Sequence, residues 1–473
     1  MGTIIRSGTL VTASETFKAD IRMDGESITE IGSSIEECSG DIVIDASGKY
    51  ILPGGVDVHT HFDLPMFGTV SSDDHYTGHK AAAFGGTTTV IDFVPQDTSP
   101  LLENVRRWRM KADPKAAIDF SFHMNITHLD RVVESEIPSL LQEGITSIKV
   151  FTAYNNRLRL LDNEIFKVLR IAREHGILTM VHAENGDVID TLIEEALADG
   201  HTEPEWHAKT RPAWGAVEAV LRSVSLAAQA DAPLYIVHMN AGGEVDQLEY
   251  ARSKGLNVMG ETCPQYLFFT DDNLAQPDGA KWVCSPPVRT LQDQARLWEG
   301  LQNGTIQVLS TDHCAFFFDG TKSIDYEGKP VAIPGKELGK SDFTKIPNGL
   351  PGVGDRLPIL WTYAVGSGRL SMNQFVALNC TNPAKLFGMY PQKGTLMPGS
   401  DADIVIWDPD KKIKYGVQYS QQRTDYNLYE GWDLVGYPEK VFLRGNLIMD
   451  DQKWLGKPGS GKFIYRKISS AAL

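Results

Sequence analysis

The stretch Gly54-Gly55-Val56-Asp57-Val58-His59-Thr60-His61 decides the fold, because it is a short apolar run that ends in two histidines. Seven further short apolar runs follow it, separated by helix-period segments such as 164–175 and 211–230. The runs are apolar throughout instead of alternating, which is typical of strands buried on both faces of a parallel sheet. The eight runs cover residues 56–58, 89–91, 120–122, 147–151, 178–181, 234–237, 258–259 and 307–309.

Eight such strands over about 250 residues, joined by helical crossovers, predict an α/β fold of the (β/α)8 TIM-like barrel type. A doubly wound open sheet is the alternative. That fold usually carries a glycine-rich phosphate-binding turn after its first strand. Here the first strand runs into histidines instead, which favours the barrel.

Short β-rich runs also occupy both ends of the chain, at 4–6, 9–11, 21–23 and 42–44 and again at 404–407 and 441–444. Neither end has enough strands for a sheet of its own, since isolated hairpins are marginally stable. We therefore expect both termini to form one small β-sandwich domain with the barrel inserted between them. The expected boundaries are 1–52 for its first part, 53–400 for the barrel, and 401–473 for its second part with a C-terminal tail. Residues 317–340 are polar and rich in glycine and proline, and predict a long loop.

Composition excludes several classes of partner. The chain has 473 residues with 45 Lys+Arg against 61 Asp+Glu, a net charge of −16 that does not suit binding to nucleic acid or to an anionic membrane. No apolar run approaches the roughly 18 residues of a membrane span. The five cysteines are scattered singly without a CxxC pair. This pattern suits a reducing compartment, so we expect a cytoplasmic protein.

Polar side chains mark the ends of the predicted barrel strands, where chemistry occurs in this fold. Strand one ends at His59 and His61, strand five at His182 and strand six at His238, while Asp312 follows strand eight. One histidine at a strand end is more often a hydrogen-bonded structural residue. Four of the 12 histidines converging on one pocket with an aspartate predict a metal centre instead.

Lys149 lies inside the fourth predicted strand, in Ser-Ile-Lys-Val-Phe. An unpaired ammonium buried beside metal ions would cost several kcal/mol or more, which drives the side chain towards its neutral amine. A neutral amine can capture carbon dioxide and become a carbamate, an anionic ligand that bridges two metals. A structural lysine paired with Asp312 is the alternative.

Several blocks in order give the chain a resemblance to the hydantoinase/dihydropyrimidinase family of cyclic amidohydrolases, within the amidohydrolase superfamily. The blocks cover residues 53–61, 85–89, 144–151, 181–185, 261–266, 310–314, 345–349 and 391–395. The resemblance extends over nearly the whole chain. It implies a metal-dependent barrel that carries a β-sandwich built from both termini, as expected above.

The resemblance also implies a role for each site residue. His59, His61, Lys149 and Asp312 are similar to the ligands of one metal, and Lys149, His182 and His238 to the ligands of a second. Lys149 would be N6-carboxylysine, and a hydroxide would bridge two divalent ions, usually zinc in this family. Tyr154 resembles an oxyanion donor and catalytic residue, and Ser285 and Asn348 resemble residues whose backbone groups hold the substrate's amide edge. Residues that resemble the lining of the pocket for the exocyclic substituent are Leu64, Pro65, Phe67, Gln96, Asn155 and Asn156.

The implied reaction is hydrolytic ring opening of a small-molecule cyclic diamide or ureide, a 5,6-dihydropyrimidine or 5-substituted hydantoin, to an N-carbamoyl amino acid. Asp312 would take the proton of the bridging hydroxide and pass it to the leaving nitrogen. The natural ring, its enantiomer, the metal identity and the role of residues 317–340 stay open. The family also implies a homotetramer or homodimer.

Two other classes of function compete with this interpretation. Allantoinase shares the metal ligands, whereas a dihydroorotase usually has an arginine two residues after the second histidine, where this chain has Asp63. Collapsin response mediator proteins are non-catalytic relatives that have lost metal ligands, and all six ligand positions are filled here. Metal content per chain and rates on a panel of cyclic substrates would separate these classes.

Overall fold

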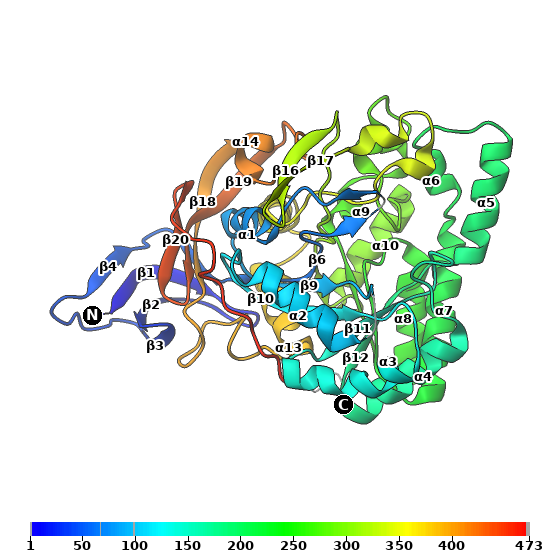
Figure 1. Cartoon of the computed structure of the whole chain (residues 1–473). Coiled ribbons are helices and arrows are strands. Elements are labelled where there is room, and N and C mark those ends of the chain that lie inside the picture. The colour runs from blue at the N-terminus through cyan, green and yellow to red at the C-terminus, as the bar shows by residue number, and fades with distance from the viewer. Residues whose placement is uncertain (1, 67, 98–99, 470–473) are drawn as a thin grey trace.

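Eight parallel strands form the central barrel of this protein, whose computed structural model describes residues 2–66, 68–97 and 100–469 (Figure 1). Their order is β15-β14-β13-β12-β11-β10-β9-β6. The strands are β6 (Gly55–Thr60), β9 (Thr87–Val94), β10 (Asp119–Asn125), β11 (Ser147–Phe151), β12 (Leu178–His182), β13 (Leu234–Ile236), β14 (Val258–Thr262) and β15 (Val308–Leu309). Each of the eight predicted runs overlaps one of them, so the predicted barrel is confirmed.

Hydrogen bonds link the segment after β15 to β6 and to the residue that follows β6, and they join the two ends of the barrel sheet. Just after β15, the Thr311 hydroxyl donates to Asp57 Oδ2 in β6 at 2.7 Å, and His61 N donates to His313 O at 2.7 Å. Inward and outward faces of β6, β9, β11 and β12 are all buried, which explains why these strands read as continuous apolar runs.

Helices surround the barrel, as Figure 1 shows for the green and cyan elements. The longer ones are α1 (His75–Phe84), α2 (Leu101–Ala112), α4 (Asp162–His175), α5 (Gly186–Ala198), α7 (Ala213–Ala230), α8 (Gly242–Ser253) and α10 (Leu291–Gln302). The shorter ones are α3 (Arg131–Glu136), α6 (Trp206–Lys209), α9 (Pro264–Phe268), α11 (Arg356–Leu360), α12 (Met372–Val376), α13 (Asn382–Leu386) and α14 (Val417–Ser420). Helix α7 begins after Pro212, two residues later than the predicted segment, because proline suits the start of a helix and not its interior. Among the described residues, no helix is long and apolar enough to cross a membrane.

Both chain ends contribute to one nine-stranded mixed sheet beside the barrel (Figure 1). Its strands are β1 (Thr3–Val11), β2 (Thr16–Asp24), β3 (Ser27–Gly32), β4 (Ile42–Asp45), β5 (Tyr50–Pro53), β18 (Ile404–Lys414), β19 (Asp433–Leu443), β20 (Asn446–Asp450) and β21 (Lys453–Trp454). The two ends meet where β5 pairs antiparallel with β18, with Ile51 opposite Ile406. A buried apolar cluster that includes Ile5, Ile51 and Ile404 stabilises this junction. The predicted pairing of the two termini is confirmed.

Residues 317–340 are more regular than the predicted loop. They contain a hairpin of β16 (Lys322–Tyr326) and β17 (Lys329–Ile333), so the prediction of a plain loop was wrong. Glu327 and Gly328 form the turn with φ of 54° and 76°, values that suit the two-residue turns favoured in hairpins. Ile324 and Ile333 pack with Val70 of β8 (Thr69–Val70), which gives the hairpin an apolar side to bury.

The C-terminal tail returns from the terminal sheet to the barrel, as the red trace in Figure 1 shows. Ile464 N donates to Phe120 O at 2.7 Å. Arg466 is buried and donates to the hydroxyls of Ser121 and Ser147, which lie at the starts of β10 and β11. The tail therefore covers the end of the barrel opposite the predicted site.

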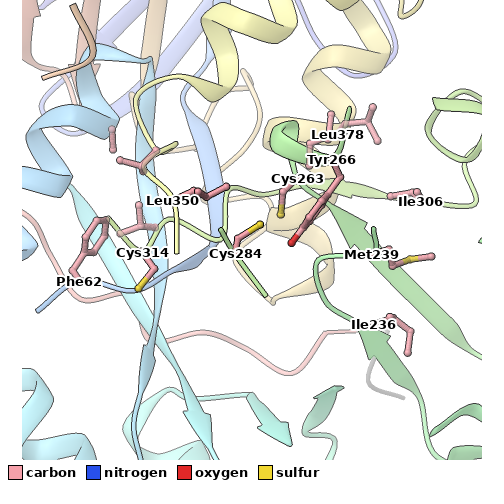
Figure 2. Close-up of a cluster of buried hydrophobic side chains, with 14 of the residues drawn as sticks. Phe62, Ile236, Met239, Cys263, Tyr266, Cys284, Ile306, Cys314, Leu350 and Leu378 are labelled. Atoms are coloured by element: carbon pink, nitrogen blue, oxygen red, sulfur yellow. The ribbon is translucent and has the colours of Figure 1, made fainter. Parts of the chain in front are cut away.

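Four of the five cysteines belong to the apolar core. Figure 2 shows Cys263, Cys284 and Cys314 among apolar side chains such as Met239, and Cys380 is also buried. Burial raises the pKa of the Cys284 thiol to about 12. All five cysteines are free, and the buried thiols pack as small apolar groups.

Candidate functional site

The strand ends at one mouth of the barrel bring the predicted site residues together. His59 and His61 come from the end of β6, Lys149 from β11 and His182 from the end of β12. His238 follows β13, and Asp312 follows β15. These residues converge because the carboxyl ends of parallel strands meet on the same side of a barrel.

The first cluster consists of His59, His61 and Asp312. One candidate ligand atom from each lies within 4.8 Å of the other two. Asp312 Oδ1 lies 3.1 Å from His61 Nε2 and 3.2 Å from His59 Nε2. Burial lowers the pKa of both histidines, which keeps the imidazoles neutral and able to bind a metal.

Glu261, near the end of β14, contacts His59 at the ring nitrogen that does not face Asp312. Its carboxylate contacts His59 Nδ1 and accepts hydrogen bonds from the Tyr235 hydroxyl at 2.9 Å and from His238 N at 3.3 Å. Burial raises the pKa of Glu261 to about 8, while these donors favour its charged form. When Glu261 is charged, His59 carries its proton on Nδ1, and its Nε2 faces Asp312 Oδ1 as an unprotonated acceptor.

The second cluster pairs His182 with His238. His182 Nδ1 lies 3.0 Å from His238 Nε2, and His182 Nε2 lies 3.0 Å from the buried Glu184 carboxylate. Glu184 fixes the proton on Nε2, so Nδ1 presents its lone pair to the cavity. Burial lowers the pKa of His238 well below its usual value. The centroids of the His238 and His59 rings are 5.3 Å apart, so the two clusters adjoin.

Lys149 lies between the two clusters. Its Nζ is 3.0 Å from His59 Nε2 and 4.3 Å from the centroid of the Phe93 ring. The side chain is 2% exposed, and burial lowers its pKa to about 8. No ion pair joins it to Asp312 or to another carboxylate within the described parts of the chain, so the structure does not support the alternative of a structural Lys149–Asp312 pair.

A cavity of about 230 Å³ opens onto both clusters. It is lined by His61, Lys149, His182, His238 and Asp312, and by the predicted substrate-binding residues Tyr154, Ser285 and Asn348. The ring centroids of Tyr154 and His182 are 5.1 Å apart with the rings tilted, and burial raises the pKa of the Tyr154 hydroxyl, which stays a hydrogen-bond donor. The Asn348 side-chain amide donates to the Ser285 hydroxyl at 3.0 Å.

The predicted substituent pocket is only partly reproduced. Leu64 and Pro65 line the cavity, together with Met66, Pro95, Asn125, Phe151, Arg157, Leu158, Cys314 and Gly349. Gln96, Asn155 and Asn156 do not line it; Asn155 donates to two aspartates on α5 instead. Phe67 lies outside the described residues.

Glu184 and Glu261 are functional residues whose roles the sequence did not reveal. Both occur in the blocks that carry the family resemblance, but neither stood out as a ligand. Glu184 is two residues after His182, a spacing that puts both side chains on one side of an extended segment. Glu261 and His59 are 202 residues apart in the sequence, and only the closed barrel brings them into contact.

Known proteins resemble this chain along its whole length. The profile of the amidohydrolase family matches residues 50–448. A D-hydantoinase of Geobacillus stearothermophilus is 45% identical over 98% of this chain and 97% of its own length, and one of Streptomyces coelicolor is 42% identical over 98% of each chain. The crystal structure of a dihydropyrimidinase from Brevibacillus agri superposes with a TM-score of 0.95 at 46% identity, covering 99% of this chain and 100% of that one.

Amidohydrolases depend on metal, and the cluster of His59, His61 and Asp312 offers the ligand types that such a family requires. The relatives from Geobacillus stearothermophilus and Brevibacillus agri are 45–46% identical to this chain over 98–99% of its length, so no separate region of the chain is left without a match. The chain therefore belongs to the amidohydrolase family, as a hydrolase of its hydantoinase and dihydropyrimidinase branch.

Proposed function

We propose that this enzyme is a dihydropyrimidinase/D-hydantoinase that opens 5,6-dihydropyrimidines or D-5-substituted hydantoins to N-carbamoyl amino acids. The observation that carries the proposal is the convergence of both histidine clusters, Lys149 and Asp312 on one cavity that Tyr154 also lines. The names of the relatives, D-hydantoinase and dihydropyrimidinase, support this choice of substrates.

The donor set fits two divalent cations, for which zinc is our proposal. His59 Nε2 and Asp312 Oδ1 are both acceptors and lie 3.2 Å apart, an arrangement that a cation between them would stabilise. His182 Nδ1 and His238 Nε2, 3.0 Å apart, are the candidate ligand atoms for the second cation. Lys149 as a carbamate would add an anionic oxygen ligand to each, and its buried, weakly basic amine suits that modification.

When bound, such ions lower the pKa of a water molecule and polarise a carbonyl group. Asp312 would accept a proton from the attacking water and deliver it to the ring nitrogen as the amide bond breaks. The Tyr154 hydroxyl would donate to the carbonyl oxygen as negative charge develops there. Backbone groups of Ser285 and Asn348 would hold the ring amide, since both residues line the cavity next to each other.

Initial rates on a panel of cyclic substrates test this function. The panel comprises dihydrouracil, D- and L-5-substituted hydantoins, dihydroorotate and allantoin, offered to enzyme with its zinc content measured. We expect turnover of dihydrouracil and of the D-hydantoins with two zinc ions per chain. A preference for allantoin would identify an allantoinase, and a metal-free, inactive protein would point to a non-catalytic relative.

The assembly and the compartment are part of the same proposal. We infer a homotetramer, by analogy with the family, and light scattering coupled to size-exclusion chromatography measures its mass. Five free cysteines suit a reducing compartment such as the cytoplasm. The proposed binding partners are the small cyclic substrate and further copies of the chain.

A further inference from the structure

The segment 317–340 contacts segments that line the cavity, although none of its own described residues lines it. Its hairpin, β16–β17, packs on Val70, and the Thr69 hydroxyl donates to Pro334 O at 2.8 Å (Figure 1). Strand β8, which contains Thr69 and Val70, pairs antiparallel with β7 (Pro65–Met66), and both residues of β7 line the cavity. After the β16–β17 hairpin the chain turns inward at Lys336, whose backbone N donates to Phe317 O at 2.8 Å and closes the segment at its base.

Lys336 is a buried cation with only carbonyl partners. Its side chain is 1% exposed, and Nζ donates to Val283 O at 2.9 Å and to Pro347 O at 3.2 Å. No carboxylate forms an ion pair with it in the described ranges. The titratable groups that face it are the thiols of Cys284 and Cys314 and the His207 imidazole. Burial lowers the pKa of Lys336 to about 7.

A buried lysine without a counter-ion lowers the stability of the folded protein. Removing an ammonium from water without a counter-ion costs several kcal/mol, and an apolar side chain of similar length would avoid this cost. Two neutral carbonyl partners recover only part of that cost, since hydrogen bonds to charged groups contribute about 1.5–3 kcal/mol each. The position of the ammonium therefore calls for an explanation other than stability.

The two carbonyls belong to the backbone segments that we propose as the substrate's amide-binding edge. Val283 lies two residues before Ser285, and Pro347 lies directly before Asn348. Val283 O also accepts a hydrogen bond from Gly349 N at 3.1 Å, which ties the two segments together. Lys336 adds a second link between them, because its Nζ bonds to a carbonyl of each.

We propose that Lys336 is a positioning residue for substrate binding: the hydrogen bonds from its Nζ fix the spacing of segments 283–285 and 347–349 and polarise their peptide groups. The hydrogen bond to the Pro347 carbonyl strengthens the N–H of Asn348 as a donor, because hydrogen-bonded peptide groups polarise each other. The effect acts on the ring amide equally in the bound substrate and in the transition state. This inference rests on the proposed function, since it takes these segments to bind the ring.

Steady-state kinetics of Lys336→Met on dihydrouracil and on a D-5-substituted hydantoin tests the inference. If the substitution weakens binding of the substrate and of the transition state equally, Lys336→Met should have a KM at least tenfold higher than wild type. Its kcat should stay within threefold of wild type, and its zinc content should be unchanged. Lys340→Met is the matched control, because Lys340 is exposed and ends the same short helical turn, η4 (Lys336–Gly339). Lys336→Gln, which keeps one donor, should give an intermediate KM and replaces the methionine variant if that variant does not fold.

Three results would overturn the inference. They are an unchanged KM in Lys336→Met, a fall in kcat and melting temperature without a rise in KM, and an equal rise in KM in Lys340→Met. In each case an active wild-type enzyme would leave the proposed function standing. A wild-type enzyme that opens neither ring would refute the proposed function and this inference with it.

Discussion

Replacing Glu261 by glutamine should weaken metal binding while leaving the fold intact. Glu261 touches no cavity surface but accepts from His59, from the Tyr235 hydroxyl and from His238 N. Glutamine keeps the shape and one acceptor oxygen, so His59 can stay in place but loses its anionic partner. Loss of such a supporting carboxylate typically costs 10–100-fold in metal affinity, or about 1.4–2.7 kcal/mol.

Glu261→Leu should behave differently. It leaves three donors without an acceptor in a buried site, and each unpaired donor costs about 1–3 kcal/mol. We therefore expect the metal-free leucine variant to lose at least about 3 kcal/mol in its free energy of unfolding. The metal-free glutamine variant should lose much less, since its amide still pairs with part of the same network.

Zinc competition against a chromophoric chelator measures the affinity, and urea denaturation of the metal-free proteins measures stability. The control is Glu244→Gln. Glu244 is also a buried glutamate, 2% exposed, but it accepts from Asn240 N and Ala241 N at the start of α8 and touches no proposed ligand. A zinc affinity of Glu261→Gln within twofold of wild type, or an equal loss in Glu244→Gln, would refute the reasoning.

Three further perturbations test the site. Asp312→Asn should keep the circular-dichroism spectrum and lose about 10²–10⁴-fold in kcat, since the amide cannot carry the proton; near-normal turnover would remove Asp312 from the mechanism. Lys149→Ala should lose the bridged metal pair, which metal analysis after dialysis measures; two ions per chain remaining would rule out the carbamate bridge. Lys336 has a folded pKa of about 7 against 10.5 for an ordinary lysine, so above pH 7 the unfolded chain holds a proton that the folded chain has released. The unfolding free energy of wild type relative to Lys336→Met should therefore rise with pH from about 7 to 10, by up to about 1.4 kcal/mol per pH unit, and a pH-independent difference in urea titrations would contradict this.

The barrel and the convergence of the candidate ligands at one of its ends were predictable because they depend on local patterns. A strand buried on both faces reads as an apolar run, and a polar residue at its end stands out against that run. His59, His182 and His238 each follow this rule, and the barrel brings them together without further information. The pairing of the termini was predictable for a similar reason, since neither end had enough strands alone.

The supporting contacts were not predictable because they join residues that are distant in sequence. Glu261 reaches His59 across the barrel, and Lys336 reaches Val283 and Pro347 from a segment that lacks a strong apolar period. The β16–β17 hairpin was missed although Glu327-Gly328 is a turn signal, because its strands are mostly polar and exposed. Its few apolar residues are buried by packing with Val70, which lies on another segment and which the local sequence does not reveal.

The buried lysines of this protein differ in whether carboxylates surround them and in the direction of their pKa shift, and their positions in the structure explain the difference. Lys393 lies near the start of β10 among carboxylates, with Nζ 2.5 Å from Asp119 and 2.8 Å from Asp403, and these charges raise its pKa. Lys149 lines the cavity, and Lys336 bonds to two segments that line it. Neither forms an ion pair with a carboxylate among the described residues, and burial lowers their pKa values to about 8 and about 7. A paired lysine supports the fold and is chemically inert, whereas an unpaired one is either reactive as an amine or a hydrogen-bond donor to neutral groups. We therefore assign the first role to Lys149, whose amine lies between the metal-ligand clusters, and the second to Lys336, whose partners are backbone carbonyls behind the substrate.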